Sequence, residues 1–203
     1  MDTSRAFWRN TTHDWANAVD LAHLSGIRRD PVAFAPGGTW HLVLEVVAYA
    51  ADEAECGDGG RCRVTLHPDG SVSVADEGRG TDTRFDEDGQ VVKKPVMATK
   101  DLRFFDSPEA QILPDGHPRR GMSVVAALSE RLVHTNRRHN GSWTQRYEHG
   151  VPVTGLEAVP DDGTTGTTVH FRPGERLRAE GWSRGDAVAL ATAWPHLAVE
   201  VRP

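Results

Sequence analysis

The sequence predicts an α+β fold, a two-layer α/β sandwich in which helices cover one face of a mixed, mostly antiparallel sheet. An apolar run of helical length fills residues 40–54. Two stretches of alternating residues, 61–78 and 133–153, contain the turn sequences HPDG and NG and predict hairpins. Further strands are expected at 165–173 and 198–203. This order of helices and strands is typical of an α+β sandwich.

The remaining segments are assigned by their spacing of apolar residues and by their Pro and Gly content. Three more helices are predicted by apolar residues at helical spacing, at 12–25, 121–132 and 186–197. Residues 27–38 are punctuated by Pro and Gly and predict a connector. Residues 80–120 are irregular, and we expect a long loop with short helical pieces near 90–97. Loops of this length are usually functional lids or disordered segments.

Composition limits the classes of function. The chain has 203 residues, enough for one domain or two small ones, and a net charge of -6 without a basic stripe. We therefore expect no direct nucleic-acid partner. No apolar run reaches the roughly 18 residues of a membrane span, and the first residues lack a signal-peptide pattern, so we expect a cytoplasmic protein without a membrane partner. Cys56 and Cys62 are expected to be free thiols, and no spacing of Cys and His predicts a metal site.

Several separate motifs, in one order along the chain, resemble a known family. They are IRRDPVAF (27–34), HLVLEVVAYAADEA (41–54), VTLHPDGSVSVADEGRG (64–80), and, within 122–171, MSVVAALSERL, QRYEHGVPV and TGTTVHF. Together they resemble the ATPase domain of the B subunits of bacterial DNA gyrase and topoisomerase IV. The resemblance implies the Bergerat fold of the superfamily of gyrases, heat-shock chaperones, histidine kinases and MutL (GHKL).

The resemblance assigns roles in a nucleotide site to several residues. Glu45 matches the general base that activates the water attacking the γ-phosphate, and an apolar helix would desolvate its carboxylate, which suits proton transfer. Asp76 matches the aspartate that binds the adenine amino group, and Thr167 the threonine beside the base. The other matches are glycines that allow close approach to the base and a wall ion pair: Gly78, Gly80, and Arg79 with Glu53.

The chain departs from the family pattern on the phosphate side. Tyr49 stands where the family has an asparagine that coordinates Mg²⁺, and a neutral phenol is a poor ligand for that cation. The glycine-rich lid motif is replaced by DGHPRRGMS (115–123), in which Pro118 lacks the N–H group that could hold a phosphate. Arg119 and Arg120 replace small residues there.

Two further departures lie near the same half of the site. An earlier glycine pair of the family becomes ATKDLRFF (98–105), and the Ile-Pro pair that follows the base-side glycines becomes Thr81-Asp82. The helix at 40–54 therefore looks inherited from an ATPase that has given up its metal chemistry.

Each of these residues also has a structural interpretation. Glu45 could simply face a solvated cleft, and Tyr49 could serve a ligand or plug an emptied pocket. Arg119 and Arg120 could contact phosphate or lie on a solvated lid.

The predicted organisation is an N-terminal arm or helix at 1–26 and a GHKL-like domain at 27–203 with a lid at 81–121. A transducer domain, which supplies a phosphate-sensing lysine in the family, is not expected. Trp8 and Trp15 of the arm either support a homodimer, as gyrase-type arms do, or pack on their own protomer.

Three functions remain open at this point. The first is a repurposed fold that binds an organic small molecule instead of hydrolysing Mg-ATP, as a biosynthetic enzyme of bacterial secondary metabolism that performs cyclisation, isomerisation or another proton transfer. The second is a divergent ATP-binding switch or ATPase, with ATP and Mg²⁺ as cofactors. The third is a pseudo-ATPase that binds gyrase or another partner. Under the first hypothesis no cofactor and no metal ligand is expected.

The candidate residues under the first hypothesis form two groups. The candidate catalytic residues are Glu45, Tyr49 and Asp76. The candidate ligand-binding residues are Glu53, Gly78, Arg79, Gly80, Thr81, Arg119, Arg120, Met122 and Thr167.

Overall fold

The structure is a computed structural model that describes residues 19–81, 97–105, 110–178 and 184–203. Its helices are α2 (Leu21–Arg29), α3 (Pro31–Phe34), α4 (Thr39–Glu55), α5 (Leu102–Phe105), α6 (Met122–Ala127), α7 (Glu175–Arg178) and α8 (Arg184–Thr192). Its strands are β1 (Gly60–Leu66), β2 (Val72–Asp76), β3 (Ser129–Arg137), β4 (Trp143–Glu148), β5 (Val151–Pro152), β6 (Glu157–Ala158), β7 (Gly166–Pro173) and β8 (Leu197–Arg202).

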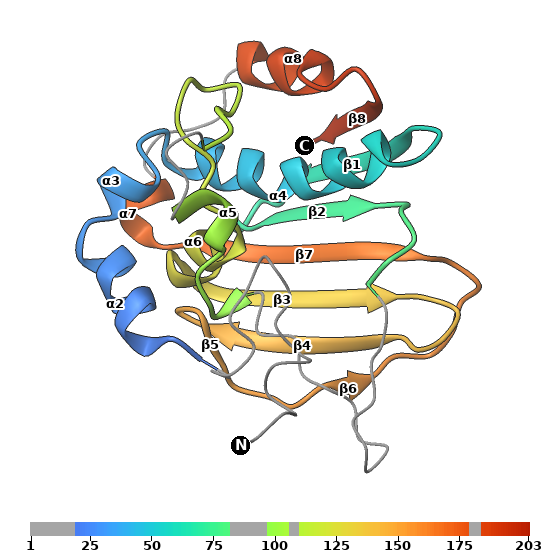
Figure 1. The fold of residues 1–203 in the computed structure, drawn as a ribbon, viewed down its shortest axis with the longest axis horizontal. Helices are drawn as coiled ribbons and strands as arrows, with labels where there is room; N and C mark the ends of the chain where they lie inside the picture. The colour runs from blue at the N-terminus through green and yellow to red at the C-terminus, as the bar shows by residue number, and fades with distance from the viewer. Residues whose placement is uncertain (1–18, 82–96, 106–109, 179–183) are drawn as a thin grey trace, which may run out of the picture.

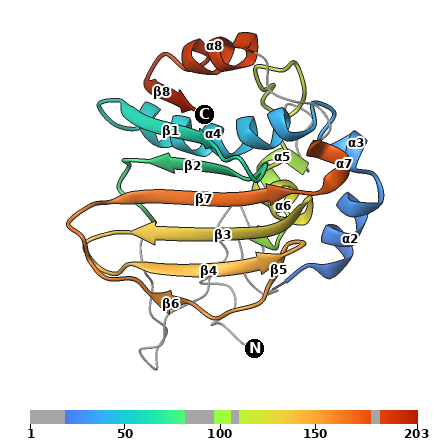
Figure 2. The same ribbon diagram turned by 180° about the vertical axis from the view of Figure 1, so that it is seen from behind.

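The strands form one eight-stranded sheet in the order β5-β4-β3-β7-β2-β1-β8, with β6 paired to β4. Within the described residues only β1 and β8 pair in parallel, and the other pairs are antiparallel. Helices α4 and α6 lie on one face of this sheet (Figure 1), and the view from behind shows the strands uncovered (Figure 2). The predicted α+β sandwich with helices on one face is therefore confirmed.

Helix α4 is the centre of the molecule. Twelve of its 17 residues are buried, because its apolar side chains pack on the sheet along one side and under the neighbouring loops along the other. Each fully buried Val or Leu stabilises the fold by roughly 1.5–3 kcal/mol. Two polar residues, His41 and Glu45, are also fully buried in this helix. Buried ionisable groups need partners, and those partners form part of the site described below.

Two predicted helices end earlier in the structure. The helix expected at 121–132 stops at Ala127, and Ser129 begins β3 instead. The alternating residues of β3 pair with β4 on one side and β7 on the other, and this tertiary pairing overrides the helical spacing. The helix expected at 186–197 stops at Thr192, shortly before Pro195, which cannot continue a helix.

Two N-terminal predictions also change. Helix α2 continues to Arg29, where the connector was expected, and the Asp20 carboxylate caps it by accepting a hydrogen bond from the His23 N–H at 2.9 Å. Asp30 caps the short α3 in the same way, within the expected connector. Residues 1–18 of the arm predicted at 1–26, with their tryptophans, and the helical pieces expected near 90–97 lie outside the described residues, apart from Met97.

Candidate functional site

A cavity of about 230 Å³ lies between α4 and the sheet. Its walls are mainly apolar, formed by Val46 and Ala50 of α4 and by Val74 and Val169 of the sheet. The other lining residues are Tyr49, Glu53, Asp76, Gly80, Thr81, Met97, Met122, His134, Trp143 and Thr167. An apolar slot with a few polar groups is the usual form of a small-molecule site, although this one is smaller than the roughly 300–1,000 Å³ of drug-sized pockets.

Asp76 is the polar centre of this cavity. It is the last residue of β2, and its Oδ1 accepts a hydrogen bond from the Gly78 N–H at 2.8 Å. Burial raises the pKa of Asp76, the hydrogen bond from Gly78 opposes that shift, and the nearby Glu53 carboxylate adds to it. The carboxyl is thus held in place by the turn that follows it.

Two glycines, of which Gly80 lines the cavity, allow backbone segments to approach each other closely. A Cβ on Gly166 would lie 2.0 Å from the Asp76 carbonyl oxygen, and a Cβ on Gly80 would lie 2.3 Å from the Arg137 carbonyl oxygen. Both have positive φ, 127° and 69°. Asn136 fixes the backbone of the lining residue Thr81, since its side chain accepts from the Thr81 N–H at 2.6 Å and donates to the Thr81 carbonyl at 2.9 Å.

The predicted wall ion pair is present at the rim. The Arg79 guanidinium donates to both oxygens of Glu53, one of them at 3.0 Å from Nη2. The guanidinium lowers the pKa of Glu53. This contact is largely exposed, so its contribution to stability is small.

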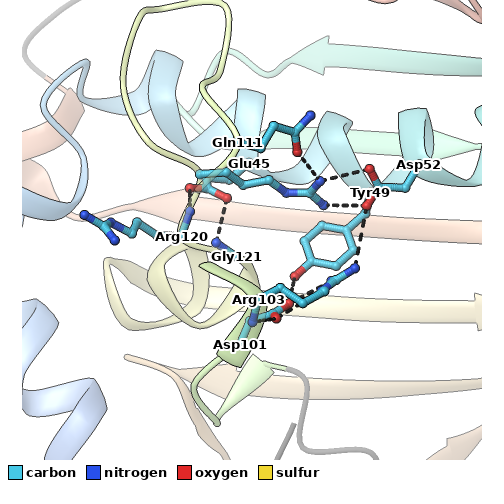
Figure 3. Close-up of polar contacts among 9 residues, drawn as sticks. Glu45, Tyr49, Asp52, Asp101, Arg103, Gln111, Arg120 and Gly121 are labelled. Atoms are coloured by element: carbon cyan, nitrogen blue, oxygen red, sulfur yellow. Dashed lines mark hydrogen bonds and ion pairs between the residues drawn. The ribbon is translucent and has the colours of Figure 1, made fainter. Parts of the chain in front are cut away.

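Glu45 is enclosed by the loop that precedes α6. Its Oε1 accepts from the Arg120 N–H at 2.5 Å and its Oε2 from the Gly121 N–H at 2.7 Å (Figure 3). The side chain is fully buried and does not line the cavity. Both oxygens are therefore occupied by backbone donors.

His41 lies one turn before Glu45 and binds the same loop. Its Nδ1 lies 2.6 Å from Asp115 Oδ2, and its Nε2 lies 3.4 Å from Glu45 Oε1. Burial alone would lower the pKa of His41, but hydrogen bonds and charge from Asp115 and Glu45 raise it to about 9. The imidazolium pairing in turn helps to lower the pKa of Asp115 against the effect of burial.

Tyr49 lies one turn after Glu45 and is packed among charged side chains. Its hydroxyl donates to Asp101 Oδ2 at 2.9 Å (Figure 3). The Arg119 guanidinium lies over the Tyr49 ring at 4.4 Å and over the Phe104 ring at 4.5 Å. Burial and the Asp101 carboxylate raise the pKa of Tyr49, so the phenol remains a neutral donor.

Arg119 is itself almost completely buried, with 1% of its side chain exposed. Its Nη1 donates to Asp52 Oδ1 at 2.9 Å and to Gln111 Oε1 at 2.7 Å. Nη2 lies 2.9 Å from Asp52 Oδ2. Asp101 is held from the other side by Arg103, whose Nη2 donates to Asp101 Oδ2 at 2.8 Å. These residues are linked by polar and ring contacts, and we call them the Arg119 cluster: Tyr49, Asp52, Asp101, Arg103, Phe104, Gln111 and Arg119.

The structure brings together most of the residues predicted from the sequence. Seven line the cavity: Tyr49, Glu53, Asp76, Gly80, Thr81, Met122 and Thr167. Gly78 and Arg79 line an adjacent surface hollow. Glu45, Arg119 and Arg120 lie beside the cavity but do not line it, and the Arg120 side chain donates to the Phe104 carbonyl at 3.1 Å.

Sequence reasoning missed several residues of the site. His134 and Trp143 line the cavity with their rings packed edge to face, 5.0 Å between centroids. Alternation along the predicted hairpin could have identified them as inward-facing. Asp101 and Asp115 could not be identified because Tyr49 and His41, their partners on α4, are distant in the chain, and His41 is marked only by its spacing of four residues from Glu45.

Neither a metal site nor a membrane helix is found in the part of the chain that the structure describes. No group of three or more His, Cys, Asp or Glu side chains is placed to hold a metal ion there. No described helix combines the length and the apolar character that crossing a membrane requires.

Comparisons with known proteins agree with this architecture, although no family model matches the chain. The B subunit of DNA gyrase from Thermotoga maritima is 37% identical over 174 residues, covering 81% of this chain and 27% of that protein. The B subunit of DNA topoisomerase 4 from Bacillus subtilis is 34% identical over 158 residues, covering 75% and 24%. The chain therefore spans about a quarter of the length of these curated relatives.

A solved structure gives the same result at the level of the fold. The ATP-binding domain of topoisomerase IV of Francisella tularensis, in complex with a small-molecule inhibitor, matches with a TM-score of 0.59 and 26% identity, covering 78% of this chain and 44% of that one. The shared sheet with helices on one face and the similarity along most of the chain show that this protein belongs to the GHKL-fold family of the gyrase and topoisomerase IV B subunits.

Proposed function

We propose that this chain is a small-molecule-binding member of the gyrase B family that does not hydrolyse Mg-ATP. One observation carries the proposal. The residues at the family's metal and phosphate positions are bound to one another, whereas the cavity on the base side is open. The positions that match the family's metal and phosphate site, which we call the phosphate half, are thus filled by the chain's own side chains.

The chemistry of ATP hydrolysis supports the proposed loss of ATPase activity. A general base must lie within hydrogen-bonding reach of the water whose proton it takes. Both oxygens of Glu45 already accept backbone N–H groups, and the carboxylate has no exposed surface. At the metal position, the Tyr49 hydroxyl donates its proton to Asp101. Mg²⁺ requires oxygen ligands in a near-octahedral arrangement, and a phenol engaged in this way offers it none.

The cavity supports binding of a flat organic molecule. It lies between apolar side chains of α4 and of the sheet, and Asp76 and Thr167 supply polar atoms. The related topoisomerase IV domain binds a small-molecule inhibitor, which supports a small-molecule ligand for the same fold here. We propose that the natural ligand is a small metabolite and not a nucleoside triphosphate.

A proton-transfer enzyme is a second candidate function, which one observation favours. Burial raises the pKa of Asp76 within the cavity, and a carboxylate with a raised pKa is a better general base. Glu45 does not line the cavity, so we assign this role to Asp76. Turnover by a biosynthetic enzyme of this kind would be lost on Asp76→Asn, while binding of neutral ligands would remain.

The test of the proposed function uses a pair of blocking variants on β7. Thr167 lines the cavity, whereas Thr168 points to the opposite face of the strand. Ligand-observed NMR with a library of flat bicyclic heteroaromatics should detect binders to the wild type and to Thr168→Tyr, but none to Thr167→Tyr. Phosphate release from Mg-ATP should equal that of buffer. Hydrolysis by the wild type, or equal binding to both variants, would overturn the proposal.

A further inference from the structure

At the end of β7 that leads into α7 (Figure 2), the uncovered face of the sheet carries several basic side chains. Arg131 lies at the start of β3 and Arg172 at the end of β7. Each is next to a buried residue of its own strand, so its side chain points to the opposite face, away from α4 and the cavity. The two arginines are direct cross-strand partners. Like charges at such positions repel each other, and a bound anion would offset that repulsion.

Two histidines lie beside this arginine pair. His170 precedes Arg172 by two residues on β7 and faces the same side of the sheet. The centroid of its ring lies 5.0 Å from that of His67, which directly follows β1. Ser73 Oγ lies 2.7 Å from Nε2 of His67. Ser71 Oγ lies 2.9 Å from Nε2 of His170. Both rings are thus held in place next to each other.

The hydrogen bonds of Ser71 determine which nitrogen of His170 carries a proton. The Ser71 hydroxyl donates to Asp69 Oδ1 at 2.6 Å, because a carboxylate only accepts. The single hydrogen of the hydroxyl is then used, so Nε2 of His170 must donate to the Ser71 oxygen. A second proton on this ring goes to Nδ1 and makes the ring a cation. His170 therefore offers a further N–H to an anion only in its protonated state.

Charges of both signs surround the two histidines. The charged or titratable side chains described at this end of the sheet are His67, Asp69, Glu130, Arg131, Glu148, His170, Arg172 and Arg178. Glu130 binds two of these arginines, with oxygens 3.2 Å and 2.8 Å from their nitrogens. Burial lowers the pKa of His170, and the nearby basic side chains add to that shift, whereas Asp69 opposes it. Because the arginines and the carboxylates of this group balance one another, the histidines decide its net charge.

We propose that this end of the uncovered face binds a tetrahedral dianion of the phosphate class, and that the two histidines must be protonated for it to bind. An arginine fork donates two parallel hydrogen bonds to such an oxyanion, and an imidazolium donates from both of its nitrogens. The two charges that protonation adds match the charge of the dianion. The site is independent of the proposed function, because it lies on the opposite face of the sheet from the cavity.

The first test uses sulfate, which remains a dianion at every pH of the experiment. Its dissociation constant from the full chain is measured by NMR titration at pH 5.5 and at pH 8, with NaCl holding the ionic strength constant. Because binding takes up protons, sulfate should bind at least tenfold more tightly at pH 5.5. It should also raise the pKa at which the His170 ring titrates. The same affinity at both pH values would overturn the inference.

Two matched pairs of variants locate the site. His170→Gln should remove the pH dependence, whereas His139→Gln should keep it, because His139 is exposed in the turn after β3, next to Arg138. Arg131→Gln should weaken binding at pH 5.5 at least fivefold. Arg137→Gln should not, because Arg137 lies on the same face of β3 at the other end of the strand. Equal losses within either pair would contradict the proposed site.

Two further comparisons define the class of ligand. Dimethyl phosphate, a monoanion like the phosphodiester of a nucleic acid, should bind at least tenfold more weakly than sulfate, and equal binding would contradict the dianion class. Tighter binding of phenyl phosphate than of inorganic phosphate at pH 6 would assign the site to phosphate monoesters, and equal or weaker binding would assign it to the free ion. If His170→Gln does not fold, the affinities of the wild type at the two pH values still decide.

Discussion

At the scale of single residues, Arg119 joins helix α4 to the loop before α6. Its guanidinium is buried between two aromatic rings and joins Asp52 on α4 to Gln111 on the loop. An arginine suits this position because its planar group can stack and donate several hydrogen bonds at once, which a lysine cannot. The residue that sequence reasoning assigned to phosphate contact or a solvated lid is instead part of the interior.

Replacement of Arg119 should therefore cost far more than replacement of a surface arginine. Arg119→Ala removes the buried ion pair and both ring contacts, and we expect a loss of roughly 3 kcal/mol in the free energy of unfolding. Arg146, paired at 3.8 Å with Glu157 and 55% exposed, is the control. Its replacement by Ala should cost less than about 1 kcal/mol. Urea denaturation of both variants checks the difference, and equal costs would contradict a structural role of Arg119.

His41 makes the stability of the fold depend on pH. Its pKa is about 9 in the folded protein against an ordinary value of 6.5. The folded state thus binds the proton more tightly, and the resulting stabilisation is complete below about pH 6.5 and lost as the pH rises through 9. At about 1.4 kcal/mol for each pH unit between the two pKa values, the loss amounts to roughly 3 kcal/mol.

The check compares unfolding free energies between pH 6.5 and 10 in the wild type and in His41→Gln. Glutamine keeps a donor for Asp115 but has no charge to lose, so the variant should lack this part of the pH dependence. The difference between the two proteins isolates His41 from Cys62, whose raised pKa also lowers stability at high pH. If the free energy of unfolding depends on pH in the same way in both proteins, His41 is not charged in the folded state.

At the scale of elements, α4 presents one polar stripe to the loop before α6. His41, Glu45, Tyr49 and Asp52 follow each other at spacings of four, four and three residues, so they lie along one side of the helix. Each of them contacts residues 101–121. The sequence predicted the helix and two of these residues as a site, but it could not predict their partners, which lie 52 to 76 positions further along the chain.

The hairpins also show that strands set by local signals were predicted, whereas strand ends set by pairing with distant segments were not. Turn residues and alternation predicted β1 and β2 to within a few residues, since both signals are local. The start of β3 at Ser129 was missed because SERL also fits the end of a helix, and pairing with β7 decides between the two. The cavity residues His134 and Trp143 depend on that pairing as well.

The close approach between the start of β7 and the end of its neighbour β2 requires a glycine. Gly166 has positive φ, and a Cβ there would lie 2.0 Å from the Asp76 carbonyl oxygen. Gly166→Ala should lower the free energy of unfolding by roughly 3 kcal/mol or more, since the backbone must move. Gly163 also has positive φ but no neighbour within 4 Å, and Gly163→Ala should cost about 1 kcal/mol. Chemical denaturation of both variants tests this, and equal costs would contradict the close approach.

At the scale of the whole molecule, the proposed function divides the site into two halves. An open cavity surrounds Asp76, and the residues at positions that match the family's metal and phosphate site are bound to one another in the Arg119 cluster and the loop before α6. The fold could be predicted from sequence because several motifs resemble one family in order. From the sequence, the contacts of the Arg119 cluster could be anticipated only as departures from the family pattern at Tyr49 and in the lid. They depend on side chains from several segments that lie far apart in the chain.

We expect that two substitutions can reopen the phosphate half. Tyr49→Asn restores the family's metal-ligand residue, and Arg119→Gly restores a small residue in the lid while it removes the guanidinium from between the rings. Together they open space and remove the Tyr49 hydroxyl from Asp101 and the Arg119 guanidinium from Asp52, while Arg103 stays bound to Asp101. The double variant should therefore gain Mg²⁺-dependent affinity for a triphosphate, with the loss of stability expected above for Arg119.

The most direct measurement is a calorimetric titration of wild type and the Tyr49→Asn/Arg119→Gly variant with a non-hydrolysable ATP analogue, with and without Mg²⁺. We predict no Mg²⁺-dependent binding by the wild type and an affinity at least tenfold higher for the double variant with Mg²⁺. Tight Mg²⁺-dependent binding by the wild type would contradict the claim that the chain fills its own phosphate site.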